Sequence, residues 1–310
     1  MKNKICIFGA NSIIAEKFIS LYSEKFEMIC IARKKLYSAK DKKVYKNILF
    51  DISKENNSRN NIILSEKLKE SNSQIKNIFI LYSWAGGPRS SKSNEGKLIW
   101  EANERIISNF VEICENSKPS HVIFLSSAGA IYDPNCELEG LENSKTNYSS
   151  PYGEQKLFCE KLLLVLSKKI NFNLTILRVS TAYGFDPKFS DQGVLNKWLF
   201  SAKNNLKIVL YNSLDSFVNF ISFDQIAQAT NIVIEKNIFG LFNIGSKEST
   251  SLNQILEIVK KVSKNKNLEI VYKNQTKRLF KLNTSLFKAS SGLNFEDNLY
   301  IEALKIYDNI

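Results

Sequence analysis

The chain has 310 residues, of which 44% are hydrophobic and 24% charged, which suits one large globular domain or a domain with a smaller lobe. No apolar run approaches the ~20 residues of a membrane span, and the first residues lack a signal-peptide pattern, so we expect a cytoplasmic protein without a membrane span. The five cysteines form no C-x-x-C pair, and the one histidine, His121, leaves little from which to build a zinc site or a Ser-His-Asp triad. We therefore expect no bound metal.

The net charge of +12 could attract nucleic acid. However, the lysines are dispersed along the chain, without a basic block or tail, and Lys, Asn, Ile and Ser are all abundant together. This pattern is typical of compositional bias, and we expect no nucleic-acid partner.

Short apolar runs alternate with helical patterns up to about residue 180. The runs that predict strands are 4–8, 27–31, 47–50, 77–82, 121–126 and 173–179, and the helical patterns are 12–22, 58–70, 97–114 and 152–168. Apolar strands separated by helices are typical of a parallel sheet that is buried on both faces. We therefore predict an α/β fold with a Rossmann-type doubly wound parallel sheet.

The pattern changes in the last part of the chain, where strands at 207–211 and 268–272 are separated by helices at 223–235 and 251–263. We predict that residues 1–180 form an NAD(P)-binding Rossmann domain, to which later segments return. Residues 181–310 are predicted to form mainly a smaller α/β lobe that binds substrate.

The first predicted strand runs into the stretch GANSIIA. Gly9 supplies a tight turn, and Asn11 and Ser12 tolerate turn geometry and can donate or cap. Ile13 and Ile14 would wall off a ligand. Because a helix N-terminus offers unpaired N–H groups and the positive end of a dipole, we predict that this turn binds a dinucleotide pyrophosphate. The alternative is a plain strand–helix turn, since one glycine of the usual three is present.

The second predicted strand ends in IARKK, without the acidic residue that grips the adenine ribose in NAD-binding Rossmann folds. Ala32 stands there, and Arg33 after it suits a 2′-phosphate, so NADP(H) is favoured as cofactor and NAD(H) is possible. The alternative is that the cations are only solvated surface charges. After the third strand, Asp51 and Ile52 would flank the adenine.

The stretch SPYGEQK holds Tyr152 and Lys156, and no other of the twelve tyrosines is followed by lysine at this spacing. A step of four residues places both side chains on one helix face. A neighbouring ammonium and a positive nicotinamide ring favour the phenolate and would lower the pKa of the tyrosine, which could then act as a general acid or base. We predict that the two residues form a catalytic pair.

The order of these motifs resembles the extended short-chain dehydrogenase/reductase family, which contains nucleotide-sugar epimerases, dehydratases and reductases. The segments that carry the resemblance, within about residues 4–305, are GANSIIA, LYSWAGGP, FLSSAGAIY, YGEQK, LRVSTAYG, DQGVLNKWL, FNIGSKESTSL and LNTS. The resemblance implies an NAD(P)-dependent enzyme with a nucleotide-sugar substrate, in which Lys156 also bonds the nicotinamide ribose. It places Tyr82, Ser83 and Trp84 at the nicotinamide side, and Asn103 where the family has a helix asparagine. It also implies a homodimer, paired through the helices at 97–114 and 152–168.

The chain departs from the family at the substrate-bonding serine. The family places this hydroxyl four residues before Tyr132, where this chain has Ala128. We favour Ser127 as the substrate-bonding residue, with Ser126 second.

Two further departures concern the substrate diphosphate. Thr181 stands in place of the family's asparagine, and Val218 in place of its arginine. Arg278, or one of Lys273 and Lys277, could replace the lost phosphate contact.

Three functions stay open on this basis. The favoured one is an NADPH-dependent reductase of a 4-keto nucleotide sugar, because Ser12 and Ala15 replace two glycines and suggest a weaker hold on the cofactor. The alternative is a nucleotide-sugar 4-epimerase, similar to UDP-glucose 4-epimerase, that retains its NAD. A non-enzyme alternative is an NAD(P)-binding regulatory protein.

Overall fold

A computed structural model describes residues 2–34, 36, 46–55, 58–70, 72, 74–87, 95–133, 139–148, 150–185, 193–265, 267–276 and 281–310. The chain divides into two compact units. The first unit comprises 1–131, 147–178 and 227–242, and the second comprises 132–146, 179–226 and 243–310.

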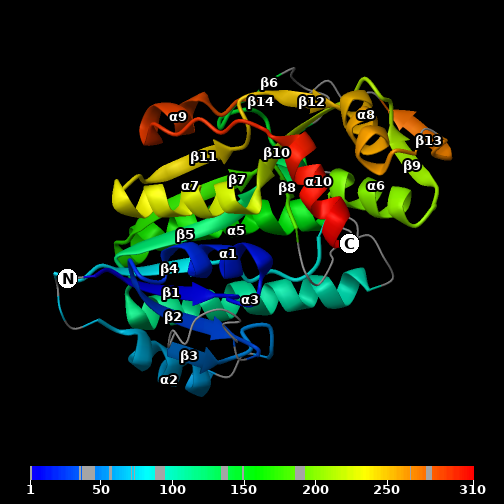
Figure 1. Cartoon of the computed structure of the whole chain (residues 1–310). Helices are drawn as coiled ribbons and strands as arrows, with labels where there is room; N and C mark the ends of the chain where they lie inside the picture. Colours follow the sequence, from blue (N-terminus) through cyan, green and yellow to red (C-terminus); the bar gives the residue numbers. More distant parts are fainter. Residues whose placement is uncertain are drawn as a thin grey trace. The chain divides into compact units, whose positions relative to one another are not determined.

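The first unit is built on a seven-stranded sheet with the order β11-β7-β5-β4-β1-β2-β3 (Figure 1). Its strands are β1 (Lys4–Phe8), β2 (Glu27–Ala32), β3 (Lys46–Leu49), β4 (Asn77–Leu81), β5 (His121–Ser127), β7 (Asn173–Val179) and β11 (Gly240–Ile244). Strand β1 pairs in parallel with both β2 and β4, which is where the strand order reverses. In such sheets, ligands bind at the carboxyl ends of the strands beside this switch point.

Helices cover both faces of this sheet. They are α1 (Ile13–Tyr22), α2 (Ser58–Leu68), α3 (Gly96–Ser117), α4 (Ala128–Ile131), α5 (Pro151–Ile170) and the last part of α7 (Phe223–Glu235). Phe8 and Phe79 of the sheet pack with Phe110 of α3 in a core that α2 and α5 complete. On the opposite face, Phe18 of α1 lies beside Tyr82. The predicted α/β fold with a large parallel sheet is confirmed.

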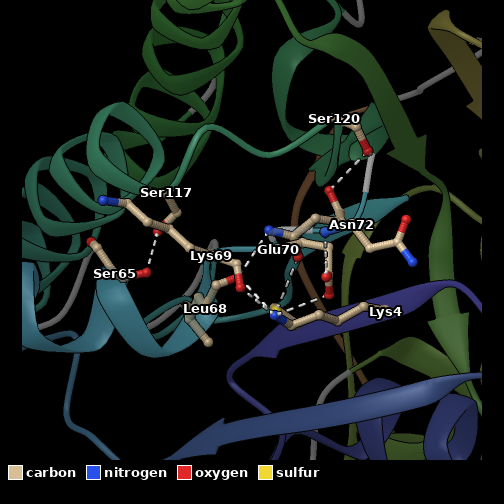
Figure 2. A network of polar contacts seen from close by, with 10 residues as sticks. Lys4, Ser65, Leu68, Lys69, Glu70, Asn72, Ser117 and Ser120 are labelled. Atoms are coloured by element: carbon tan, nitrogen blue, oxygen red, sulfur yellow. Dashed lines mark hydrogen bonds and ion pairs between the residues drawn. The ribbon is translucent and has the colours of Figure 1, made fainter. Parts of the chain in front are cut away.

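A buried lysine fastens the end of α2 to the edge of the sheet where the strands begin (Figure 2). Lys4 is 6% exposed, and its Nζ donates to the carbonyls of Leu68 at 3.0 Å and Lys69 at 2.8 Å. The carboxylate of Glu70 lies 3.7 Å away. Since the last carbonyls of a helix have no partner within it, a cation there satisfies them and interacts favourably with the helix dipole. Asn77 of β4 donates to the same Leu68 carbonyl at 2.9 Å.

The second unit is made of shorter elements. Strands β8 (Thr181–Tyr183), β10 (Phe217–Ser222) and β12 (Ser249–Ser251) form one sheet, β9 (Ile208–Asn212) pairs with β13 (Ile270–Thr276), and β6 (Glu139–Gly140) pairs with β14 (Lys281–Leu282). Its helices are α6 (Val194–Lys203), α8 (Leu252–Ser263), α9 (Ser285–Ser291) and α10 (Leu299–Asn309). Trp198, Leu256 and Ile306 bring α6, α8 and α10 into one core. In the described part of the chain, no helix has the length and apolarity needed to cross a membrane.

Several large apolar side chains are exposed on the outer faces of α3 and α5. Phe158 and Val165 of α5 are 58% and 65% exposed, and Leu98 of α3 is 65% exposed. Phe158 also lines a cavity of about 300 Å³ beside Trp100 of α3. Apolar surface of this kind marks an interaction site.

We predict that the protein forms a homodimer through this surface, because pairing would bury the exposed side chains. Light scattering at micromolar concentration should give twice the chain mass, and Phe158→Glu should give a monomer. Leu206→Glu, at an exposed residue of the second unit, serves as the matched control and should stay dimeric. A monomeric wild-type protein would contradict the prediction.

Candidate cofactor and catalytic site

The turn after β1 holds α1 against the carboxyl edge of the sheet. Gly9 has φ +84°, and a Cβ built on it would lie 2.5 Å from the backbone nitrogen of Ser83. A side chain is therefore excluded both by conformation and by space. Ser12 caps α1, its side chain accepting from the N–H of Ala15 at 3.3 Å. The helix thus starts at Ile13, with its dipole positive at this edge of the sheet.

A cavity of about 270 Å³ opens at this edge. The structure brings nine of the predicted cofactor residues into its lining: Gly9, Asn11, Ser12, Arg33, Asp51, Ile52, Tyr82, Ser83 and Trp84. Sequence reasoning missed Phe50, Ser53, Ala85 and Ile106, which also line it. Phe50 and Ser53 directly flank the predicted Asp51–Ile52 pair. A prediction that included one more residue on each side of this pair would have contained both.

Two polar side chains in the lining fix the loops around the cavity. The amide oxygen of Asn11 accepts from the N–H of Lys34 at 3.2 Å, which ties the turn after β1 to the loop after β2. The carboxylate of Asp51 accepts from the N–H and the hydroxyl of Ser53, at 3.1 and 2.6 Å. Arg33 is exposed at the cavity wall, and within the described residues its guanidinium pairs with no carboxylate.

Asn103 lies behind the cavity and is fully buried. Its amide accepts from the N–H of Ala85 at 2.8 Å, and donates to the carbonyl of Ala85 at 3.2 Å and to the Gln155 side chain at 2.9 Å. Gln155 in turn donates to the carbonyl of Trp100 at 2.9 Å. The asparagine therefore joins the loop after β4 to α3 and α5, and it is not among the residues that line the cavity.

Tyr152 stands in the first turn of α5. Ser150 caps this helix by accepting from the N–H of Gly153 at 3.3 Å, and Gly153 allows the helix to lie against the backbone of Ala130 in α4. The Tyr152 hydroxyl is hydrogen-bonded to the side chain of Ser127, at the end of β5. The first turn of α5 is thus brought directly to the end of the central strands.

Burial raises the pKa of Tyr152 to about 12, although the hydrogen bond from Ser127 acts in the opposite direction. The fall in this pKa was expected from Lys156 together with a positive nicotinamide ring, and in the protein without that ring burial is the largest effect. Nζ of Lys156 lies 5.8 Å from the Tyr152 ring centroid and donates to the carbonyl of Leu125 at 2.7 Å. Lys156 itself is 5% exposed, and burial lowers its pKa to about 7.

The two candidate serines are separated by their surroundings. Ser127 contacts Tyr152, whereas Ser126 is 4% exposed and its hydroxyl has no protein partner among the described residues. The contact with Tyr152 favours Ser127 as the substrate-bonding residue.

Ile13 and Ile14, also predicted at the cofactor, are partly buried in the first turn of α1 and are not among the residues that line the cavity. The residues considered for the substrate diphosphate fall in the second unit. Thr181 lies in β8, where it is paired with Phe220, and Val218 lies in β10, paired with Thr250. Lys273 is exposed on β13. Arg278 and Lys277 lie outside the described residues. The substrate part of the prediction is therefore not tested by the structure.

The residues around the cavity fit a dinucleotide. A glycine that admits no side chain stands next to a helix N-terminus, which is the arrangement that receives a phosphate. Nε1 of Trp84 is buried without a protein partner in the described part of the chain, so a polar donor is available in the lining. The structure shows no cluster of three or more His, Cys, Asp or Glu side chains in the described ranges that could hold a metal ion. His121 is buried, and its Nε2 lies 2.8 Å from the hydroxyl oxygen of Thr175.

A seven-stranded parallel sheet with a phosphate-type turn after β1 and a Tyr–Lys pair on α5 defines a Rossmann-type dinucleotide-binding protein. The chain belongs to the NAD dependent epimerase/dehydratase family, whose model matches residues 5–245. The predicted family is thereby confirmed.

Individual relatives agree with this placement. The dTDP-4-dehydro-6-deoxyglucose reductase of Escherichia coli is 28% identical over 174 residues, which cover 56% of this chain and 54% of the relative. The chain thus spans about half the length of the curated relatives it matches: 54% of this reductase and 50% of a second relative.

Solved structures show the same fold over nearly the whole chain. The UDP-glucose 4-epimerase of Thermotoga maritima, solved with UDP-glucose, has a TM-score of 0.82 at 18% identity and covers 99% of this chain and 98% of that one. The UDP-glucuronic acid 4-epimerase of Bacillus cereus, solved with UDP-glucuronic acid and NAD, has a TM-score of 0.79 at 20% identity and the same two coverages.

Proposed function

We propose that the protein is an NADPH-dependent reductase of a 4-keto nucleotide sugar. The observation that carries this proposal is the hydrogen-bonded pair of Tyr152 and Ser127 beside the buried Lys156. Tyr152 carries its proton at neutral pH, as a general acid requires, since burial raises its pKa to about 12. The names of the relatives, which include a nucleotide-sugar reductase, support this class of substrate.

The cavity residues around Gly9 and Arg33 would hold the dinucleotide, which supplies a hydride when bound. Ser127 would orient the substrate carbonyl by a hydrogen bond to its oxygen. Tyr152 gives its proton to this oxygen as the carbon is reduced, so that the carbonyl becomes a hydroxyl. The ammonium of Lys156 stabilises the phenolate that is left until solvent returns the proton.

We propose NADP(H) as the cofactor because Arg33 offers a cation at the cavity wall that pairs with no carboxylate of the described residues, and Ala32 offers no acid to bind a ribose hydroxyl. In calorimetric titrations, NADP(H) should bind about tenfold more tightly than NAD(H), the effect of one charge-assisted contact. Arg33→Ala should remove most of this difference while leaving NAD(H) binding unchanged. Arg59→Ala, at an exposed arginine of α2, is the control. Equal affinity of the wild-type protein for the two cofactors would refute the preference.

We further propose that residues 181–310 contribute mainly to substrate binding, through Thr181 and Arg278. Arg278, which lies outside the described residues, is the candidate for the phosphate contact that Val218 cannot make.

The second candidate is a nucleotide-sugar 4-epimerase, which is the activity that the solved relatives are named for. An epimerase gains by keeping its dinucleotide between the two half-reactions, whereas a reductase must exchange it in every turnover. Native mass spectrometry of the purified protein separates the two. We expect protein largely free of dinucleotide, and a full complement of bound NAD would favour the epimerase.

A further inference from the structure

Aromatic rings surround the ammonium of Lys156. Its Nζ lies 3.9 Å from the ring centroid of Trp84 and 4.7 Å from that of Phe124, and the ring of Tyr152 is the third, at 5.8 Å. A cation over an aromatic face within about 6 Å of the centroid is attracted by the ring quadrupole, most strongly by indole. The indole of Trp84 is thus the nearest and the strongest of these partners.

No carboxylate of the described residues is paired with the ammonium of Lys156. Glu160 lies one helical turn further along α5, but its carboxylate accepts from Arg178 of β7 at 2.7 and 3.1 Å in a buried ion pair. Within the described residues, no carboxylate forms an ion pair with Lys156. Burial lowers the pKa of Lys156 to about 7, and Cys159 and Glu160 oppose that change. The carbonyl of Leu125, which accepts from Nζ at 2.7 Å, and the aromatic faces are the remaining groups that favour the charged form.

Neighbouring residues fix the position of the Trp84 indole beside Lys156. Its neighbour Ala85 donates one hydrogen bond to the Asn103 amide and accepts another from it, and the Trp84 ring packs on Phe124 at a centroid distance of 5.9 Å. Since Nε1 of Trp84 has no protein partner in the described part of the chain, packing rather than hydrogen bonding sets the ring position. The loop after β4 therefore presents an indole face to α5.

We propose that Trp84 is a positioning residue, whose indole face holds the ammonium of Lys156 in its charged form beside Tyr152. The role of this contact in catalysis rests on the proposed function, but the contact itself does not. Without the indole, the buried amine would be neutral over more of the working pH range, and it would be less able to stabilise a phenolate.

Competitive labelling of the free protein with acetic anhydride tests the proposal without cofactor or substrate. Only a neutral amine is acylated, so the pH midpoint of Lys156 labelling, read by peptide mass spectrometry, reports its protonation. Trp84→Leu should lower this midpoint by about one pH unit, while Trp84→Phe, which keeps an aromatic face, should stay close to the wild type. Trp84→Met provides the same comparison if the leucine variant is insoluble.

The other titratable groups near the amine stay constant across these variants. They are Tyr152, Cys159 and Glu160 on α5, Arg178 on β7 and Cys114 on α3, beside Cys159. Tyr300→Leu is the matched control, because it removes the ring that lies 4.5 Å from another lysine, Lys261, and should leave Lys156 unchanged. An unchanged or raised midpoint in Trp84→Leu, or an equal fall in Trp84→Phe, would overturn the proposal. Because no turnover is measured, this result is independent of whether the protein is a reductase.

Discussion

Tyr152→Phe should lower kcat by about 10²–10⁴-fold, the usual contribution of a positioned general acid. The change removes only the oxygen that carries the proton, so the fold and the cofactor affinity should be nearly unaffected. NADPH oxidation with dTDP-4-dehydro-6-deoxyglucose, the compound in the name of the Escherichia coli relative, provides the assay. The Kd for NADPH, measured by calorimetry, should stay within about twofold of the wild-type value, because the ring of Tyr152, which was also predicted at the cofactor, is kept and only the proton-transferring oxygen is lost.

Tyr272→Phe is the matched control, since Tyr272 is 54% exposed on β13. It should retain wild-type turnover. If Tyr152→Phe kept a wild-type kcat while the wild-type enzyme was active, the assignment of the proton donor would be wrong.

Lys4→Met should lower the free energy of unfolding by about 3 kcal/mol, because it removes a buried charged donor from the carbonyls of Leu68 and Lys69 at the end of α2, of which the Leu68 carbonyl keeps its bond from Asn77. Figure 2 shows that the ammonium faces Leu68, Lys69 and Glu70 together. Urea unfolding monitored by circular dichroism gives the value. Turnover of the folded variant should be unchanged, since the network lies where the strands begin and the cavity lies at their carboxyl ends.

Lys46→Met is the control for this stability prediction. Lys46 is also the first residue of a strand in the same sheet, β3, but its side chain is exposed, so its loss should cost less than about 0.5 kcal/mol. Equal effects of the two substitutions would show that the buried network does not stabilise the sheet.

The central sheet could be predicted because its strands leave a clear signal. ICIF is an uninterrupted apolar run, and its four residues are buried in β1 together with Lys4, which precedes them. Such runs are expected where both faces of a parallel sheet are covered. Among the elements that were missed, the three-residue strands β8 and β12 are too brief for any periodicity to appear. The longer elements α6, α10, β10 and β11 in the last part of the chain were missed as well.

The site was harder to predict than the fold, since distant residues determine how each side chain is used. The motif indicated Lys156, but its contacts with Trp84 and Leu125 come from loops and strands far away in the sequence. The pKa of Tyr152 was expected to fall because of Lys156, four residues away, together with a positive nicotinamide ring, and in the protein without that ring burial is the largest effect. Asn103 was recognised as significant, but a sequence cannot tell whether its amide faces a cavity or a neighbouring loop.

The measurement that bears most directly on the central claim is the stoichiometry of cofactor consumption. Purified protein is incubated with dTDP-4-dehydro-6-deoxyglucose and NADPH, and the absorbance band of reduced nicotinamide is followed while the sugar product is quantified. A reductase consumes one NADPH for each sugar reduced, because every new hydroxyl takes one hydride. We expect this ratio of one, and we expect Tyr152→Phe to abolish the signal. Interconversion of UDP-glucose and UDP-galactose by protein without added cofactor, with no net change in that band, would contradict the claim and establish an epimerase instead.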